Sequence, residues 1–223
     1  MKRFLIFLCV LLIAGRVTSQ NQVDSLLHLA LKAPEKQKTE LYLKLANSLK
    51  SDSAKSNNFA RQAYRLAEKN NQPHLQAKAL LTLAENYYKI GNFQLALQLY
   101  QKHLSLSQAL KDTAGIIQYY ISIGLSMTDR DEGNKGIEQF IEGMRYCEED
   151  TFNTGRFLFL IGRAHNRMHN FNDAIQYYRK ALVALSASKK DTSVIFNTYT
   201  GLGETYKTIQ RRDSALINYL KAK

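Results

Sequence analysis

The chain has 223 residues, of which 45% are hydrophobic and 22% are charged, and it contains only two prolines. This is enough apolar material for a sizeable core, and the scarcity of proline permits long helices. The formal net charge of +12 would make nucleic acid a candidate partner if the protein were cytoplasmic.

Residues 1–19 have the pattern of a secretory signal peptide. Lys2 and Arg3 precede the apolar run 4–14, and small residues precede the expected cleavage before Gln20. Eleven apolar residues at roughly 1.5 Å each span about half of a bilayer core, so a transmembrane helix is the weaker interpretation. We expect a secreted or periplasmic protein. Membrane attachment would require an uncleaved leader or a C-terminal region beyond this sequence.

Cleavage would change the charge and the cysteine content. The leader carries three basic residues, so the mature chain would keep about +9 (12 minus 3). Export removes the main case for nucleic acid and leaves an acidic protein partner, an anionic wall polymer or a lipid surface. Cleavage removes Cys9, so the remaining Cys147 cannot form an internal disulfide. Cys147 lies in an apolar stripe with Phe140 and Met144, and we expect it to be buried.

The segment 20–34 is expected to form a short helix that caps one end of the fold through Leu26, Leu27 and Leu31. Ten further helices are predicted from apolar residues that recur with helical spacing. They form five pairs: the first helices lie near 35–50, 72–90, 113–128, 153–169 and 192–209, and the second helices near 53–70, 93–110, 134–148, 171–187 and 212–223.

Small residues recur with a fixed spacing in four of these pairs. A small residue in the first helix is followed twelve residues later by another in the second helix, and an aromatic residue stands four residues beyond that. The small pairs are Ala84 and Ala96, Gly124 and Gly136, Gly162 and Ala174, and Gly203 and Ala215; the aromatic residues are Tyr100, Phe140, Tyr178 and Tyr219.

This spacing is explained by two antiparallel helices that cross closely, because only small side chains allow such an approach. Glycine inside a helix costs about 0.8–1.0 kcal/mol relative to alanine, so its use indicates that close contact outweighs helix propensity. We therefore expect Gly162 and Ala174 to share one crossing contact, with large residues beside it.

The alternation of large and small residues resembles the tetratricopeptide repeat, over nearly all of the expected mature chain. The repeat period is 40, 38 and 41 residues, against about 34 in the standard repeat. Such longer repeats resemble those in the exported regions of bacterial sensor and regulator proteins. The resemblance implies an all-α solenoid of about five helix-turn-helix repeats in a domain at 35–223. The repeats are expected at about 35–70, 72–110, 113–148, 153–187 and 192–223.

The sequence ends at Lys223, inside the last predicted helix and without a polar capping helix. Repeat arrays normally need such a cap. We expect either that a partner covers this end or that the sequence belongs to a longer protein.

Residues typical of catalysis or metal binding are few. His165 and His169 lie four apart on one helix face, but no glutamate of the zinc-protease motif lies between them. We expect both to be structural, with no metal, no cofactor and no enzymatic activity. The remote alternative is an enzyme that uses Cys147 or this histidine pair.

The family resemblance implies a binding groove lined by the first helices. The first-helix residues outside the core register are expected to face it: Lys78, Glu85, Tyr88, Gln118, Leu125, Arg156, Phe159, Arg163, Asn166, Asn197, Glu204 and Lys207.

Three of these residues form a more specific candidate. Arg156, Phe159 and Arg163 are three and four residues apart, so they share one helical face. That face is offset from the expected core stripe of Leu158, Ile161 and His165. It would seat an extended acidic peptide through two guanidinium groups and an aromatic ring.

Together, these observations predict an exported scaffold that binds a peptide or protein, either free or as the sensory region of a signalling protein. The alternative is an accessory module that binds a cell-wall glycan or a wall hydrolase.

Overall fold

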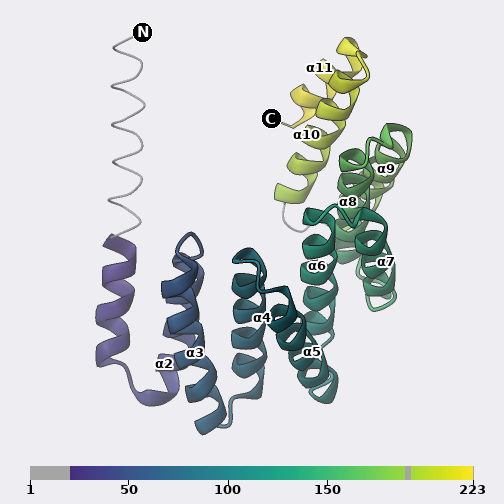
Figure 1. Cartoon of the computed structure of the whole chain (residues 1–223). Coiled ribbons are helices and arrows are strands. Elements are labelled where there is room, and N and C mark those ends of the chain that lie inside the picture. The colour runs from purple at the N-terminus through teal and green to yellow at the C-terminus, as the bar shows by residue number, and fades with distance from the viewer. Residues whose placement is uncertain (1–20, 189–191, 223) are drawn as a thin grey trace, which may run out of the picture. The chain divides into compact units, whose positions relative to one another are not determined.

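The structure is a computed structural model that describes residues 21–188 and 192–222, and the expected signal peptide lies outside these ranges. The described residues form helices and turns and contain no strand, which confirms the predicted all-α class (Figure 1). A helix covers 21–32. It is followed by α2 (Glu35–Ser48), α3 (Ser53–Lys69), α4 (Pro73–Lys89), α5 (Phe93–Ala109), α6 (Thr113–Asp129), α7 (Gly133–Met144), α8 (Thr151–Arg167), α9 (Phe171–Ser188), α10 (Ser193–Thr208) and α11 (Arg212–Lys221).

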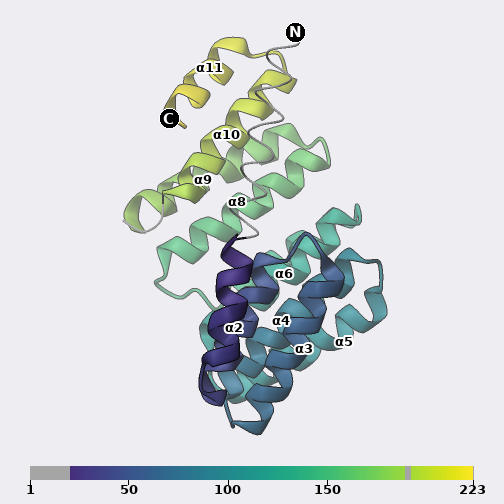
Figure 2. The same ribbon diagram turned by 90° about the vertical axis from the view of Figure 1, so that its left-hand side faces the viewer.

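The chain divides into two compact units, Met1–Asp112 and Thr113–Lys223, and each is described by itself. Within each unit, consecutive helices pack against one another (Figures 1 and 2). This is the helix-pair solenoid expected from the sequence. None of the helices in the described ranges is long and apolar enough to span a membrane. The division into a signal peptide, a capping segment and a repeat domain stays a prediction.

The first unit brings its helices together through alanines. Ala46, Ala60 and Leu83 form one buried cluster of α2, α3 and α4. A buried polar chain crosses the same helices: the Asn86 amide donates to Ser56 Oγ at 2.7 Å, and Ser56 donates to the carbonyl of Ala46 at 2.8 Å. Side chains of low volume therefore allow close approach, and the Asn86 amide nitrogen and the Ser56 hydroxyl between them are hydrogen-bonded.

The second unit uses glycines covered by aromatic rings. A Cβ atom added at Gly162 would lie 2.7 Å from the Tyr178 ring, and Gly124 and Gly203 face Phe140 and Tyr219 in the same way. The predicted register is thus correct in its large residues, but the group directly over Gly162 is Tyr178 rather than Ala174. The close crossing of two small residues is seen at Gly136, where a Cβ would lie 2.7 Å from the carbonyl oxygen of Gly124.

Three expectations about helix ends and packing were wrong. The structure ends α7 at Met144 instead of 148 and starts α8 at Thr151 instead of 153. Asp150 explains the early start, because its carboxylate accepts hydrogen bonds from the backbone N–H groups of Phe152 and Asn153 at 3.1 Å. Near the N-terminus, Leu31 is 69% exposed, so it does not contribute to a cap as expected.

Candidate functional site

The face of α8 expected to bind a peptide is only partly available. Arg163 is exposed, whereas Arg156 is half-buried and donates to Asn153 Oδ1 at 2.9 Å. Phe159 is also half-buried, and its ring centroid lies 5.9 Å from that of Tyr178. The prediction that Phe159 stands free of the core is therefore wrong, because its ring packs against the cluster of α9 and α10.

The core stripe of α8 also differs from the expected one. Phe157 is fully buried, and its ring lies 6.3 Å from Phe140. Ile161 is buried as expected, but Leu158 is only half-buried.

The ring of Tyr178 is buried between α8 and α10. Added Cβ atoms at Gly162 of α8 and at Gly201 of α10 would lie 2.7 and 2.9 Å from its ring. Burial raises the pKa of the Tyr178 hydroxyl; the positive charge of Arg163 lowers it, and the negative charge of Glu204 raises it. The phenol is therefore neutral in the folded protein, and it lies within the electrostatic reach of one cation on α8 and one anion on α10.

The structure brings the candidates of α8 and α10 together. Thr205 Oγ1 donates to Asn166 Oδ1 at 3.0 Å, which joins the two helices directly. Asn197, Glu204 and Lys207 are exposed on α10. This surface, comprising Arg163, Asn166, Asn197, Glu204 and Lys207, is called the α8–α10 face below.

On α6, the remaining candidate residues of the second unit are half-buried. Gln118 donates to Ser122 Oγ at 3.3 Å, and the aliphatic side chain of Leu125 offers a ligand no polar group. Neither adds a strong binding group.

In the first unit, the three candidates on α4 have different surroundings. Lys78 is exposed, Glu85 accepts a hydrogen bond from Lys50 Nζ at 3.2 Å, and the Tyr88 ring lies 5.0 Å from that of Phe93. Glu85 and Tyr88 thus have structural partners, and Lys78 is the exposed charge of the three.

The candidate nucleophile Cys147 is buried, as predicted. Burial raises the pKa of its thiol to about 11, so the reactive thiolate is scarce at neutral pH. The histidine pair also has a structural explanation. His165 stacks on Tyr177 at 5.2 Å with its Nδ1 4.0 Å from Asp173, while His169 occupies a left-handed turn position with φ 62°. Within the described ranges, no group of three His, Cys, Asp or Glu residues could hold a metal ion.

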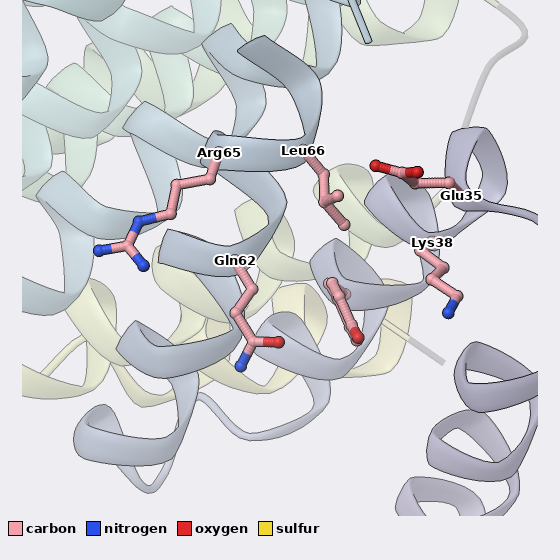
Figure 3. A pocket seen from close by; sticks show the side chains of 6 residues that line it. Glu35, Lys38, Gln62, Arg65 and Leu66 are labelled. Atoms are coloured by element: carbon pink, nitrogen blue, oxygen red, sulfur yellow. The ribbon is translucent and has the colours of Figure 1, made fainter. Parts of the chain in front are cut away.

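Two clefts on the first unit were not anticipated. The α2–α3 cleft, of about 440 Å³, is lined by Glu35, Lys38, Tyr42, Gln62, Arg65 and Leu66 (Figure 3). The α4–α5 cleft, of about 660 Å³, is lined by residues that include Gln76, Leu80, Gln98, Gln101, Lys102 and Leu106. The sequence signal was present, because aligning Ala60 with Ala96 places Gln62 and Gln98 at one repeat position. It was missed because only the first helices were considered for binding.

Family models describing the tetratricopeptide repeat match residues 79–114 and 155–182. Solved structures share the fold at low sequence identity. BtubC from P. vanneervenii is 16% identical, with 92% of this chain and 87% of that chain covered and a TM-score of 0.66. A Rap protein complexed with competence and sporulation factor is 15% identical, with 93% and 70% covered and a TM-score of 0.67.

A third similar structure is NprR in complex with its cognate peptide NprX. It is 13% identical, with a TM-score of 0.68, and the alignment covers 91% of this chain and 60% of NprR. No curated protein sequence matches the chain.

Proposed function

Because the chain is a tetratricopeptide repeat protein, we propose that it is an exported, non-catalytic scaffold that binds a peptide or protein partner on its first helices. The observation that carries the proposal is the α8–α10 face. Two successive first helices present polar side chains there, beside the half-buried ring of Phe159, which packs on the buried Tyr178. Such a combination suits a partner that needs both apolar contact and specific polar contacts.

The partner is an extended segment with acidic residues. Arg163 and Lys207 offer two exposed cations on this face, against the single carboxylate of Glu204. A similar structure supports the peptide as a class of ligand, since NprR was determined with its cognate peptide NprX, and the Rap protein was likewise determined in a complex, with competence and sporulation factor. The weak contribution of Arg156, which is bonded to Asn153, shifts the predicted site from the α8 triad toward α10.

Export and a sensory role belong to the same proposal. The leader-like pattern of 1–19 supports export, with the scaffold acting free in the periplasm or as the sensory region of a signalling protein.

The test is the charge reversal Arg163→Glu in the protein purified after export. It should reduce partner capture from periplasmic extract by roughly tenfold or more, because a charge-assisted hydrogen bond contributes about 1.5–3 kcal/mol. Chemical crosslinking and mass spectrometry would quantify each captured protein. Arg212→Glu, at the exposed start of α11, is the matched control and should change nothing. Equal capture by both variants would exclude the α8–α10 face.

A further inference from the structure

The two clefts of the first unit are lined by residues at the same positions of two consecutive repeats. When the buried alanines Ala46 and Ala84 are aligned, Lys38 and Gln76 occupy one repeat position, and Tyr42 and Leu80 another. On the second helices, aligning Ala60 with Ala96 pairs Gln62 with Gln98, Arg65 with Gln101, and Leu66 with Lys102. The same combination of an apolar floor and polar rim therefore occurs in two consecutive repeats, on α2 and α3 and again on α4 and α5.

The charged side chains available to a ligand in these clefts are all positive. Lys38, Arg65 and Lys102 form no ion pair within the described part of the chain. The carboxylate that lines the α2–α3 cleft, Glu35, already forms an ion pair with Lys69, whose Nζ lies 2.7 Å away. Figure 3 shows Lys38 and Arg65 at opposite edges of that cleft, so a ligand seated between them would have a cation on either side. An anionic ligand is therefore favoured.

The rim also carries amides, which distinguish a peptide from a simple anion. Gln62, Gln76, Gln98 and Gln101 each have both a donor and an acceptor, as a peptide backbone does. Tyr42 and Leu66 supply apolar surface in the first cleft, and Leu80 and Leu106 supply it in the second. Apolar floor, amide rim and unpaired cations together match an extended peptide that has acidic side chains.

In the second unit, the arginine at the repeat position of Arg65 forms a hydrogen bond within the protein. Arg179 stands five residues after Ala174, as Arg65 stands five after Ala60. Its guanidinium donates to the Tyr206 hydroxyl at 2.8 Å, whereas Arg65 has no such partner among the residues described. The cation of the first unit is thus available for a ligand, while its counterpart connects two helices of the second unit.

From these observations we propose that the first unit holds a second peptide-binding surface, formed by the α2–α3 and α4–α5 clefts, which takes an extended acidic segment. This surface lies on different helices from the α8–α10 face and does not depend on the function proposed for it.

The experiment measures fluorescence anisotropy with a labelled peptide of alternating glutamate and serine. Reversal of both exposed cleft cations, Arg65→Glu with Lys102→Glu, should weaken binding by roughly tenfold or more and reduce its salt dependence. The matched control is Lys55→Glu with Lys89→Glu, which makes the same charge change at exposed positions of α3 and α4 outside both clefts and should retain binding. Circular dichroism would verify that both variants fold.

Three results would overturn the inference: unchanged binding by the cleft variant, an equal loss in the control, or equal affinity for a labelled single-stranded DNA. The last would assign the clefts to polyanions in general. The cleft reversal is also measured in the Arg163→Glu background, where the α8–α10 face does not contribute to peptide binding. A loss of binding there, or its absence, tests the clefts alone, so failure of the α8–α10 face and failure of the clefts are separate outcomes.

Discussion

The two units of the molecule achieve close helix packing with different side chains. In the first unit, Ala46, Ala60 and Ala84 are fully buried, and Asn86 and Ser56 connect the helices by hydrogen bonds. In the second unit, Gly162 lies under the ring of Tyr178. Alanine favours the helix by itself, whereas glycine costs about 0.8–1.0 kcal/mol that ring packing must offset. Stability in the second unit therefore depends more on a few large side chains.

The largest effect that follows from this difference is expected for Tyr178→Ala. The ring is buried against Gly162 and Gly201, so its removal leaves a cavity lined by helices that cannot easily close. We expect a loss of about 3–5 kcal/mol in the free energy of unfolding, measured by urea denaturation. Hydrogen exchange should show the loss in α8, α9 and α10. A loss below about 1 kcal/mol would mean that the ring does not hold these helices together.

Gly162→Leu should have the next largest effect. Even a Cβ at this position would lie 2.7 Å from the Tyr178 ring, so a leucine must displace the ring or separate the helices. Overpacking typically costs about 1–3 kcal/mol, and the helix shift adds to it. The melting temperature measures the loss. Ala84→Gly in the first unit is the comparison, with an expected loss of about 1 kcal/mol from helix propensity. An unchanged melting temperature for Gly162→Leu would refute the register of the second unit.

The smallest of these effects is expected for Asn86→Ala. The substitution removes the donor to Ser56 Oγ in the buried polar chain of the first unit. Leaving a buried polar group without its partner costs about 1–3 kcal/mol, again measured by urea denaturation. Ser56→Ala in the same background should cost less than it costs alone, because the Asn86–Ser56 bond is already absent and only the bond from Ser56 to the Ala46 carbonyl remains to be lost. Full additivity of the two losses would show that they are not coupled.

The helices could be predicted from the sequence because local signals agree there. Apolar spacing located every helix pair, and the repeated glycine and aromatic positions located the ring contacts around Tyr178. The core register of α8 could not be settled in the same way. Residues 157–160 read Phe-Leu-Phe-Leu, so every position is apolar and the spacing does not choose a face. Contact of Phe157 with Phe140 makes that choice, and this contact is tertiary.

The candidate site was less predictable for a related reason. An exposed position in a helical pattern does not reveal which neighbour a long side chain will bind. Arg156 and Glu85 both lie outside the core register, yet Arg156 bonds to Asn153 and Glu85 to Lys50. Arg163 and Lys78, chosen by the same rule, are exposed. The partner of Arg156 lies in the same helix and that of Glu85 in the turn after α2, so individual contacts, rather than the periodic pattern, decide which charges remain for a ligand.

The packing of the Tyr178 ring on two glycines limits how such a chain can change during evolution. Its ring rests on a glycine of its own repeat, Gly162, and on a glycine of the following repeat, Gly201. Deleting, duplicating or exchanging the repeat that starts at α10 would place the ring against a new helix. The exchange would succeed only where that helix also has a small residue at the position of Gly201. The repeats of this unit are therefore not interchangeable modules. Each must be followed by a repeat whose glycine fits the aromatic ring before it, and this requirement fixes the order of the repeats.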